Sequence, residues 1–126
     1  MTRDFADVWR RLARRFGGTP GVVGFDLMNE PVDVVSSEGR DPAQVWRAAS
    51  QLAVEAIRST GDRTLVLVEG FGHAGVQGWA STNPQPWIRD PADNVRYEAH
   101  QYFDLDHSGT YGMTYAQEES ALRSGD

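Results

Sequence analysis

The sequence predicts an α/β fold in which three parallel strands are flanked by helices. Two apolar runs, at residues 22–28 and 64–68, and a segment of alternating side chains at residues 94–100 indicate the strands. A helical stripe separates the first run from the second, which is the spacing that a right-handed parallel crossover needs. Each run is followed by a charged or aromatic side chain. We therefore expect the chemistry of the protein at the carboxyl ends of the strands, where parallel α/β folds place their ligands.

The composition fits one domain and argues against several classes of partner. The chain has 126 residues, of which 40% are hydrophobic, so it can bury a modest core. Its 12 basic and 18 acidic residues give a net charge of −6, which argues against nucleic acid or an anionic membrane as the main partner. We find no cysteine, no apolar run of transmembrane length and no signal peptide at the start.

The first helix and strand lead to the most informative motif of the chain. Residues 5–16 have the apolar spacing of an amphipathic helix, and their arginines mark its solvated face. Residues 22–28 are almost all apolar, which predicts a strand buried on both faces. Pro31 then ends the pairing and is expected to hold Glu30 in an extended conformation. Asn29 and Glu30 are therefore presented at the tip of the strand.

The second helix and strand have clear start and stop signals. Asp41 is the expected N-cap, Pro42 the first helical position, and Gln44 is placed to complete a capping box. Residues 60–61 end the helix. The predicted buried stripe consists of Val45, Trp46, Ala49, Leu52, Ala53, Ala56 and Ile57. The strand at residues 64–68 then follows.

A long loop and a third strand complete the pattern. Residues 71–94 are rich in glycine and proline and show no helical stripe, and long loops after strand tips are typical of functional sites. In the third strand, the alternation of side chains places Glu98 and His100 on one face, followed by Tyr102.

The order of elements is that of a β/α repeat. Thr114 with Gln117 predicts the start of a last helix. Three strands cannot close a barrel, and neither end of the chain has the features of a domain boundary. We interpret residues 1–126 as a single segment of a larger (β/α)8 or TIM barrel, incomplete at both ends. An unrelated doubly wound fold explains the strands and helices equally well, but it leaves the polar residues at their ends unexplained.

Two motifs resemble those of a known family. The sequence Gly-Phe-Asp-Leu-Met-Asn-Glu-Pro at residues 24–31 is similar to the fourth strand of glycoside hydrolase family 5, the cellulase family. The sequence His-Gln-Tyr at residues 100–102, with the loop after it, resembles the sixth strand of that family. The resemblance covers nearly the whole chain. It implies a retaining, cofactor-free endo-β-1,4-glucanase on a TIM barrel, with β-glucan as its partner and an extracellular parent enzyme.

The resemblance also implies roles for individual residues. Glu30 is the expected general acid/base, which requires a raised pKa from burial and from the charge of a nearby nucleophile. Asn29 matches the asparagine whose amide binds the 2-hydroxyl of the sugar. His100 matches the histidine that orients the acid/base, and Tyr102 matches the tyrosine that hydrogen-bonds the nucleophile.

Further candidates lie outside these two motifs. Trp79 offers a flat face to a glucose ring and Trp87 is a second candidate, although packing under the loop explains either one. Residues 104–109 begin like a calcium loop, but the twelfth position is Tyr115 where a glutamate is required. We therefore expect no metal.

The nucleophile of the family is a glutamate on the seventh strand, and no strand of this sequence matches it. Glu69 and Glu98 are the carboxylates that could replace it, and neither fits the pattern. We therefore expect that the isolated chain does not turn over substrate. The alternative is an inactive truncated chain, a non-catalytic glycan-binding fragment, or a subunit that needs a partner. Exposed sheet edges at both ends favour self-association.

Overall fold

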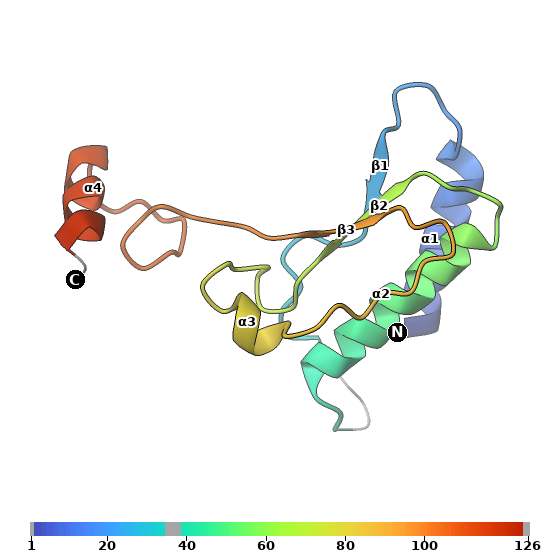
Figure 1. Cartoon of the computed structure of the whole chain (residues 1–126), viewed down its shortest axis with the longest axis horizontal. Helices are drawn as coiled ribbons and strands as arrows, with labels where there is room; N and C mark the ends of the chain where they lie inside the picture. The colour runs from blue at the N-terminus through green and yellow to red at the C-terminus, as the bar shows by residue number, and fades with distance from the viewer. Residues whose placement is uncertain (1, 35–38, 125–126) are drawn as a thin grey trace.

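A computed structural model describes residues 2–34 and 39–124, in which helices and strands alternate (Figure 1). The elements are α1 (Thr2–Phe16), β1 (Gly24–Asp26), α2 (Pro42–Arg58), β2 (Leu65–Glu69), α3 (Trp79–Thr82), β3 (Val95–Glu98) and α4 (Tyr115–Ser124). The three strands form one parallel sheet in the order β1-β2-β3. The predicted α/β architecture of three parallel strands with flanking helices is confirmed.

The core lies between the sheet and the two long helices. Phe25 pairs with Val66, and Val66 pairs with Val95, so these side chains share one face of the sheet. Helix α2 runs alongside α1 (Figure 1), and both helices contribute to the same apolar cluster. The buried members of this cluster are Ala13, Phe25, Leu27, Trp46, Ala53, Val54, Ile57, Val66 and Val68. Packing against helices on one face is what a segment of a β/α barrel requires.

The first strand is shorter and more exposed than predicted. Only residues 24–26 are extended and paired, and the side chain of Val23 is 86% exposed. Met28 is also exposed. The expectation of burial on both faces is wrong here, because β1 is an edge strand of the described sheet and the helices cover only one of its faces.

Helix α2 begins as predicted but buries a different set of residues. The side chain of Asp41 caps the first turn. Leu52, which we expected to be buried, is 38% exposed, whereas Ser50 is fully buried. The hydroxyl of Ser50 donates to the Trp46 carbonyl and accepts from the indole N–H of Trp87. Apolar periodicity cannot identify a polar residue whose burial depends on such contacts.

The C-terminal part of the chain forms an extended arm that ends in α4, apart from the sheet (Figure 1). The Oε1 atom of Gln117 accepts from the backbone N–H and the hydroxyl of Thr114, which confirms the predicted helix start. Helix α3 was not predicted, since its four residues are too few to show a period. None of the helices in the described ranges is long and apolar enough to cross a bilayer.

A buried ion pair ties the end of α2 to the segment before β3. Arg58 Nε lies 2.8 Å from Asp90 Oδ1, and the two side chains are 6% and 5% exposed. The guanidinium also donates to the carbonyls of Thr64 and Asn94, which lie just before β2 and β3. The hydrogen bonds from Arg58 hold the pKa of the Asp90 carboxyl well below its usual range.

We expect Asp90→Asn to destabilise the chain by about 3 kcal/mol, because it leaves the Arg58 charge buried without a counter-ion. Since the pKa of Asp90 is lowered on folding, its contribution is present above the ordinary value of 3.8 and is lost as the pH falls below it. Urea unfolding followed by circular dichroism measures both effects.

Asp7→Asn is the matched control, because Asp7 pairs with Arg10 and Arg11 on the more exposed surface of α1. Its expected loss of stability is much smaller than that of Asp90→Asn, because solvent screens an ion pair on the surface. Equal losses in the two variants would contradict the structural role of the Arg58–Asp90 pair.

Candidate active site

The carboxylate of Glu30 is held by two side chains from the end of β3. His100 Nδ1 lies 2.8 Å from Glu30 Oε1, and the hydroxyl of Tyr102 donates to the same oxygen at 2.9 Å. The backbone of His100 is fixed to the loop after β2. Its backbone N–H donates to the Ala74 carbonyl, and its carbonyl accepts from the Val76 N–H. The structure therefore brings together the three residues that the sequence placed at two separate strand ends.

The hydroxyl of Tyr102 donates to Glu30 in the part of the chain that the structure describes. The predicted hydrogen bond from Tyr102 to the nucleophile stays a prediction, because that nucleophile matches no residue of this sequence. In this chain, Tyr102 and His100 therefore share one acceptor oxygen.

These contacts shift the pKa of all three groups. The hydrogen bond from His100, followed by that from Tyr102, lowers the pKa of Glu30. The Glu30 carboxylate in turn raises the pKa of His100 and that of Tyr102. We expected a raised pKa for Glu30, and this expectation is wrong for this chain, because two donors stabilise the charged form by more than partial burial disfavours it.

The backbone of Glu30 also differs from the prediction. Its φ is +44°, in the left-handed region, whereas Pro31 was expected to hold it extended. A left-handed non-glycine residue costs about 1–2 kcal/mol. Two contacts offset this cost: the Glu30 N–H donates to Glu69 Oε2 at 2.5 Å, and the Pro31 carbonyl accepts from the Gly72 N–H at 2.9 Å. Tertiary hydrogen bonds thus override the local preference of the dipeptide.

Glu69 is a site residue that sequence reasoning considered only as a substitute nucleophile. Its side chain is 1% exposed, and its Oε1 lies 3.4 Å from His100 Nε2. Its backbone carbonyl accepts from the indole N–H of Trp46 at 2.8 Å. Burial raises the pKa of Glu69, which is the opposite of the direction found for Glu30. The sequence contains one feature that could have identified Glu69 as a site residue. It is a glutamate at the end of an apolar strand, as Glu30 is near the end of the first apolar run.

Two groups of residues have side chains of the kinds that bind metal ions. Ligand atoms of Glu69, Glu98 and His100 lie within 4.8 Å of one another. His100 Nε2, 3.4 Å from both carboxylates, accounts for this arrangement without an ion. Asp104, in the loop that begins like a calcium site, accepts from the backbone N–H groups of Gly109 and Tyr111 and so stabilises its own loop.

Glu30 lines two hollows. The first, of about 320 Å³, contains Glu30 together with His73, Gly75, Gln77, His100, Tyr102, His107 and Ser108. The second, of about 350 Å³, contains Glu30 and the exposed Asn29 over the side chains of Phe5 and Trp46. The predicted pair of Asn29 and Glu30 is therefore presented at the strand tip, with Glu30 at the boundary of the two hollows.

Trp79, the predicted stacking surface for a sugar ring, lies away from Glu30. Its ring is half-buried against Gly70, where an added Cβ would come within 2.4 Å of Trp79 Cζ3. Trp79 and Trp87 line a third hollow of about 320 Å³, and the ring of Trp87 lies 4.4 Å from that of Tyr97. The structure brings the two tryptophans to one hollow, but neither lines the two hollows that contain Glu30.

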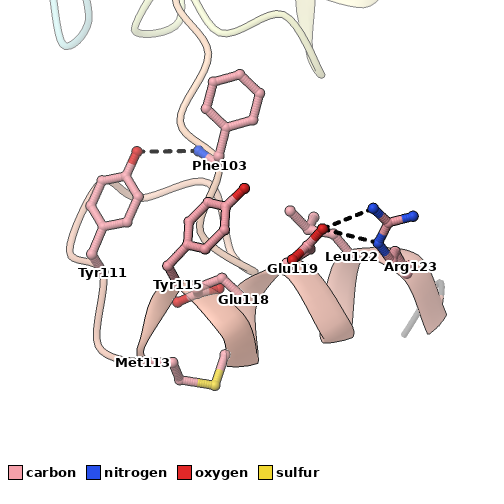
Figure 2. A pocket seen from close by; sticks show the side chains of 8 residues that line it. All are labelled: Phe103, Tyr111, Met113, Tyr115, Glu118, Glu119, Leu122 and Arg123. Carbon is pink, nitrogen blue, oxygen red and sulfur yellow. Dashed lines mark hydrogen bonds and ion pairs between the residues drawn. The ribbon is translucent and has the colours of Figure 1, made fainter.

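A further hollow, of about 720 Å³, lies on the C-terminal arm (Figure 2). Its walls are Phe103, Tyr111, Met113, Tyr115, Glu118, Glu119, Leu122 and Arg123. Glu119 pairs with Arg123, and Glu118 accepts from the Leu105 N–H. The charged groups among these eight residues are therefore engaged, and the surface that the hollow offers is mainly aromatic and aliphatic.

Comparison with known proteins extends these observations. Residues 1–124 match the family described as Cellulase (glycosyl hydrolase family 5). Endoglucanase 1 of Robillarda sp. is 32% identical over 126 residues, which cover 96% of this chain and 31% of that protein.

Solved structures give the same result. The endoglucanase Cel5A of Pseudomonas stutzeri is 44% identical, with a TM-score of 0.76, and the match covers 94% of this chain and 34% of that one. A second structure of Cel5A, in complex with cellobiose, matches with the same identity and TM-score over 93% of this chain and 32% of that one. The chain thus spans about a third of the length of these relatives.

The matched residues include both motifs on which the resemblance rests, and the three-stranded parallel sheet fits a partial (β/α)8 barrel. This chain belongs to glycosyl hydrolase family 5, the cellulase family.

Proposed function

We propose that this chain supplies the general acid/base of a retaining endo-β-1,4-glucanase. The observation that carries the proposal is the carboxylate of Glu30, which His100 and Tyr102 hold by hydrogen bonds beside an open hollow. A carboxyl group fixed by two donors has the defined orientation that proton transfer to a leaving oxygen needs. The names of the relatives support the substrate class, since they are endoglucanases.

Retaining hydrolysis proceeds in two steps with two carboxyl groups about 5–5.5 Å apart. In the first step, Glu30 gives its proton to the glycosidic oxygen while the second carboxylate attacks the anomeric carbon. In the second step, Glu30 takes a proton from the water that hydrolyses the glycosyl-enzyme. Glu69 is an unsuitable nucleophile, because it is buried and bonded to the Glu30 N–H. We assign the nucleophile to a part of the barrel outside this chain.

The first step of this mechanism requires that Glu30 be protonated. With His100 and Tyr102 as donors, the pKa of Glu30 is lowered, so this chain favours the ionised form. A second carboxylate at catalytic distance disfavours a further negative charge and raises the pKa of its neighbour. The acid form of Glu30 therefore depends, in our proposal, on the nucleophile.

The partner in this proposal is a β-glucan polysaccharide or oligosaccharide. The complex of the Pseudomonas enzyme with cellobiose supports this ligand class. Asn29, at the tip of β1, is proposed to bind the 2-hydroxyl of the sugar, and Trp79 is proposed as a stacking surface farther away. We further propose that the chain is one segment of a (β/α)8 catalytic domain whose parent enzyme is extracellular.

The second candidate function is a non-catalytic glycan-binding fragment. The lowered pKa of Glu30 favours it, because an ionised carboxylate accepts hydrogen bonds from sugar hydroxyls but donates no proton. In this alternative, the outer edges of β1 and β3 are proposed to pair with another copy of the chain.

We expect the purified chain to release no chromophore from an aryl β-cellobioside, and Glu30→Gln to be equally silent, with both folded by circular dichroism. In a protein that contains the rest of the barrel, Glu30→Gln is expected to lower kcat/KM by about 10²–10⁴. The loss is smaller for substrates with good leaving groups, which need less protonation. Turnover by the isolated chain that Glu30→Gln abolishes would place the second carboxylate in this chain or in a partner copy.

The Glu30–His100 pair predicts a window of pH for its stabilising effect. The pKa of Glu30 is lowered from 4.5 and that of His100 is raised from 6.5. The pair is therefore fully charged between these ordinary values, and its contribution decreases as the pH falls through the folded pKa of Glu30 or rises through that of His100. We expect the stability difference between wild type and Glu30→Gln to be largest in this window. Urea unfolding at several pH values measures it, and a difference independent of pH would refute the ion pair.

Cellobiose binding by the isolated chain tests the glycan contact of Asn29. Asn29→Ala removes one neutral hydrogen bond and is expected to weaken binding about fivefold, as measured by shifts in amide NMR signals. Asn94→Ala is the matched control, because Asn94 precedes β3 at the opposite end of the sheet and bonds the Arg63 carbonyl. Equal affinities of wild type and Asn29→Ala would remove Asn29 from the proposed site.

A further inference from the structure

Glu69 ends the central strand β2, between the two outer strands whose following residues carry the site. Its side chain is 1% exposed, and its two carboxylate oxygens face different partners. Oε2 accepts from the Glu30 N–H at 2.5 Å, and Oε1 lies 3.4 Å from His100 Nε2. One buried side chain thus contacts the main chain of the proposed acid/base and the side chain that orients it.

We infer that Glu69 is a positioning residue, whose buried carboxylate fixes the backbone of Glu30 on one side and the imidazole of His100 on the other. The inference rests on the proposed function of Glu30 and deepens it. Glu69 itself is remote from substrate because it is buried, so any effect on catalysis passes through Glu30 and His100.

The hydrogen bond from the Glu30 N–H to Glu69 stabilises an unusual backbone conformation. Glu30 is left-handed, with φ at +44°, and its N–H points at a carboxylate oxygen. A charged acceptor makes this hydrogen bond stronger than a neutral one. Glu69 is itself anchored, because the Trp46 indole N–H donates to its carbonyl from helix α2. The position of the Glu30 backbone is therefore set from the core through Glu69.

The contact between Glu69 and His100 affects the charge of the imidazole ring. Nδ1 of the ring faces Glu30, while Nε2 faces both Glu69 and Glu98. Carboxylates at both ring nitrogens favour the imidazolium, which donates from each of them. Glu30 makes the largest contribution to the raised pKa of His100, and the charge of Glu69 adds to it. The titratable groups around the ring are Asp26 and Glu30 near β1, Glu69 on β2, His73 in the loop, and Glu98 and Tyr102 on and after β3.

Glu98 provides a matched comparison. Its Oε1 lies 3.4 Å from the same ring nitrogen, but its side chain is 32% exposed, and it bonds His100 without contacting the Glu30 N–H. Solvent screens an exposed charge more than a buried one. If Glu69 were merely a strand-end residue, its replacement would change stability but not the protonation of His100.

The test is an NMR titration of the full 126-residue chain, labelled with ¹⁵N, in wild type, Glu69→Gln and Glu98→Gln. His100→Asn assigns the imidazole signals. We expect the midpoint of His100 to fall in Glu69→Gln by more than it falls in Glu98→Gln. We also expect the amide proton of Glu30 to move upfield in Glu69→Gln alone, because the carboxylate acceptor has become a neutral amide.

Equal midpoints in the two variants, or an unchanged Glu30 amide in Glu69→Gln, would overturn the inference. If Glu69→Gln does not fold, amide hydrogen exchange of the wild type tests the hydrogen bond between the Glu30 N–H and Glu69. Slow exchange of the Glu30 amide supports this hydrogen bond. Exchange as fast as that of the amide of the exposed Asn29 refutes it. These measurements need no turnover. Failure of Glu30→Gln to affect catalysis in the larger protein would therefore sink the acid/base role and leave the result for Glu69 standing.

Discussion

The parallel, in-register pairing of β1, β2 and β3 is the constraint on which the rest of this structure depends. Register partners such as Phe25 and Val66 face the helices, and the same register brings the three strand tips to one edge. A shift by one residue would turn every side chain of a strand to the opposite face. It would expose Phe25 and also separate Glu30 from His100. Core and site are therefore specified by one set of backbone hydrogen bonds.

At that edge the chain places two carboxyl groups in unequal surroundings. Glu69 is enclosed by protein, and burial raises its pKa, while Glu30 borders open hollows and has its pKa lowered by the donors His100 and Tyr102. Pairs of acids whose environments shift their pKa values in opposite directions are characteristic of acid–base sites. His100 lies within 2.8 Å of the Glu30 carboxylate and within 3.4 Å of the Glu69 carboxylate, so one imidazole contacts both acids. In the proposed mechanism, the lowered pKa of Glu30 is the reason that a second carboxylate is needed for Glu30 to act as an acid.

The sequence predicted those features that depend on short-range patterns. The caps at Asp41 and at Thr114 with Gln117 follow from residue types a few positions apart, and both are present. The resemblance of two motifs placed Glu30, His100 and Tyr102 together, and their hydrogen bonds agree with that placement.

The features that the sequence missed depend on contacts between distant segments. The left-handed backbone of Glu30 is hydrogen-bonded to the Glu69 carboxylate, which lies 39 positions along the chain. The burial of Ser50 requires the indole of Trp87, and the exposure of Val23 follows from the position of β1 at the sheet edge. No pattern within a single element contains this information, because each depends on which segments become neighbours in the folded chain.

Trp46 belongs to the apolar core and also supports the site. Its ring is part of the apolar core and its N–H holds the carbonyl of Glu69, the residue that contacts Glu30. This position therefore has two physical requirements, the volume of the ring and the indole N–H donor. Phenylalanine could satisfy the first requirement but not the second. Over evolutionary time, we expect such a residue to change more slowly than its degree of burial alone would suggest.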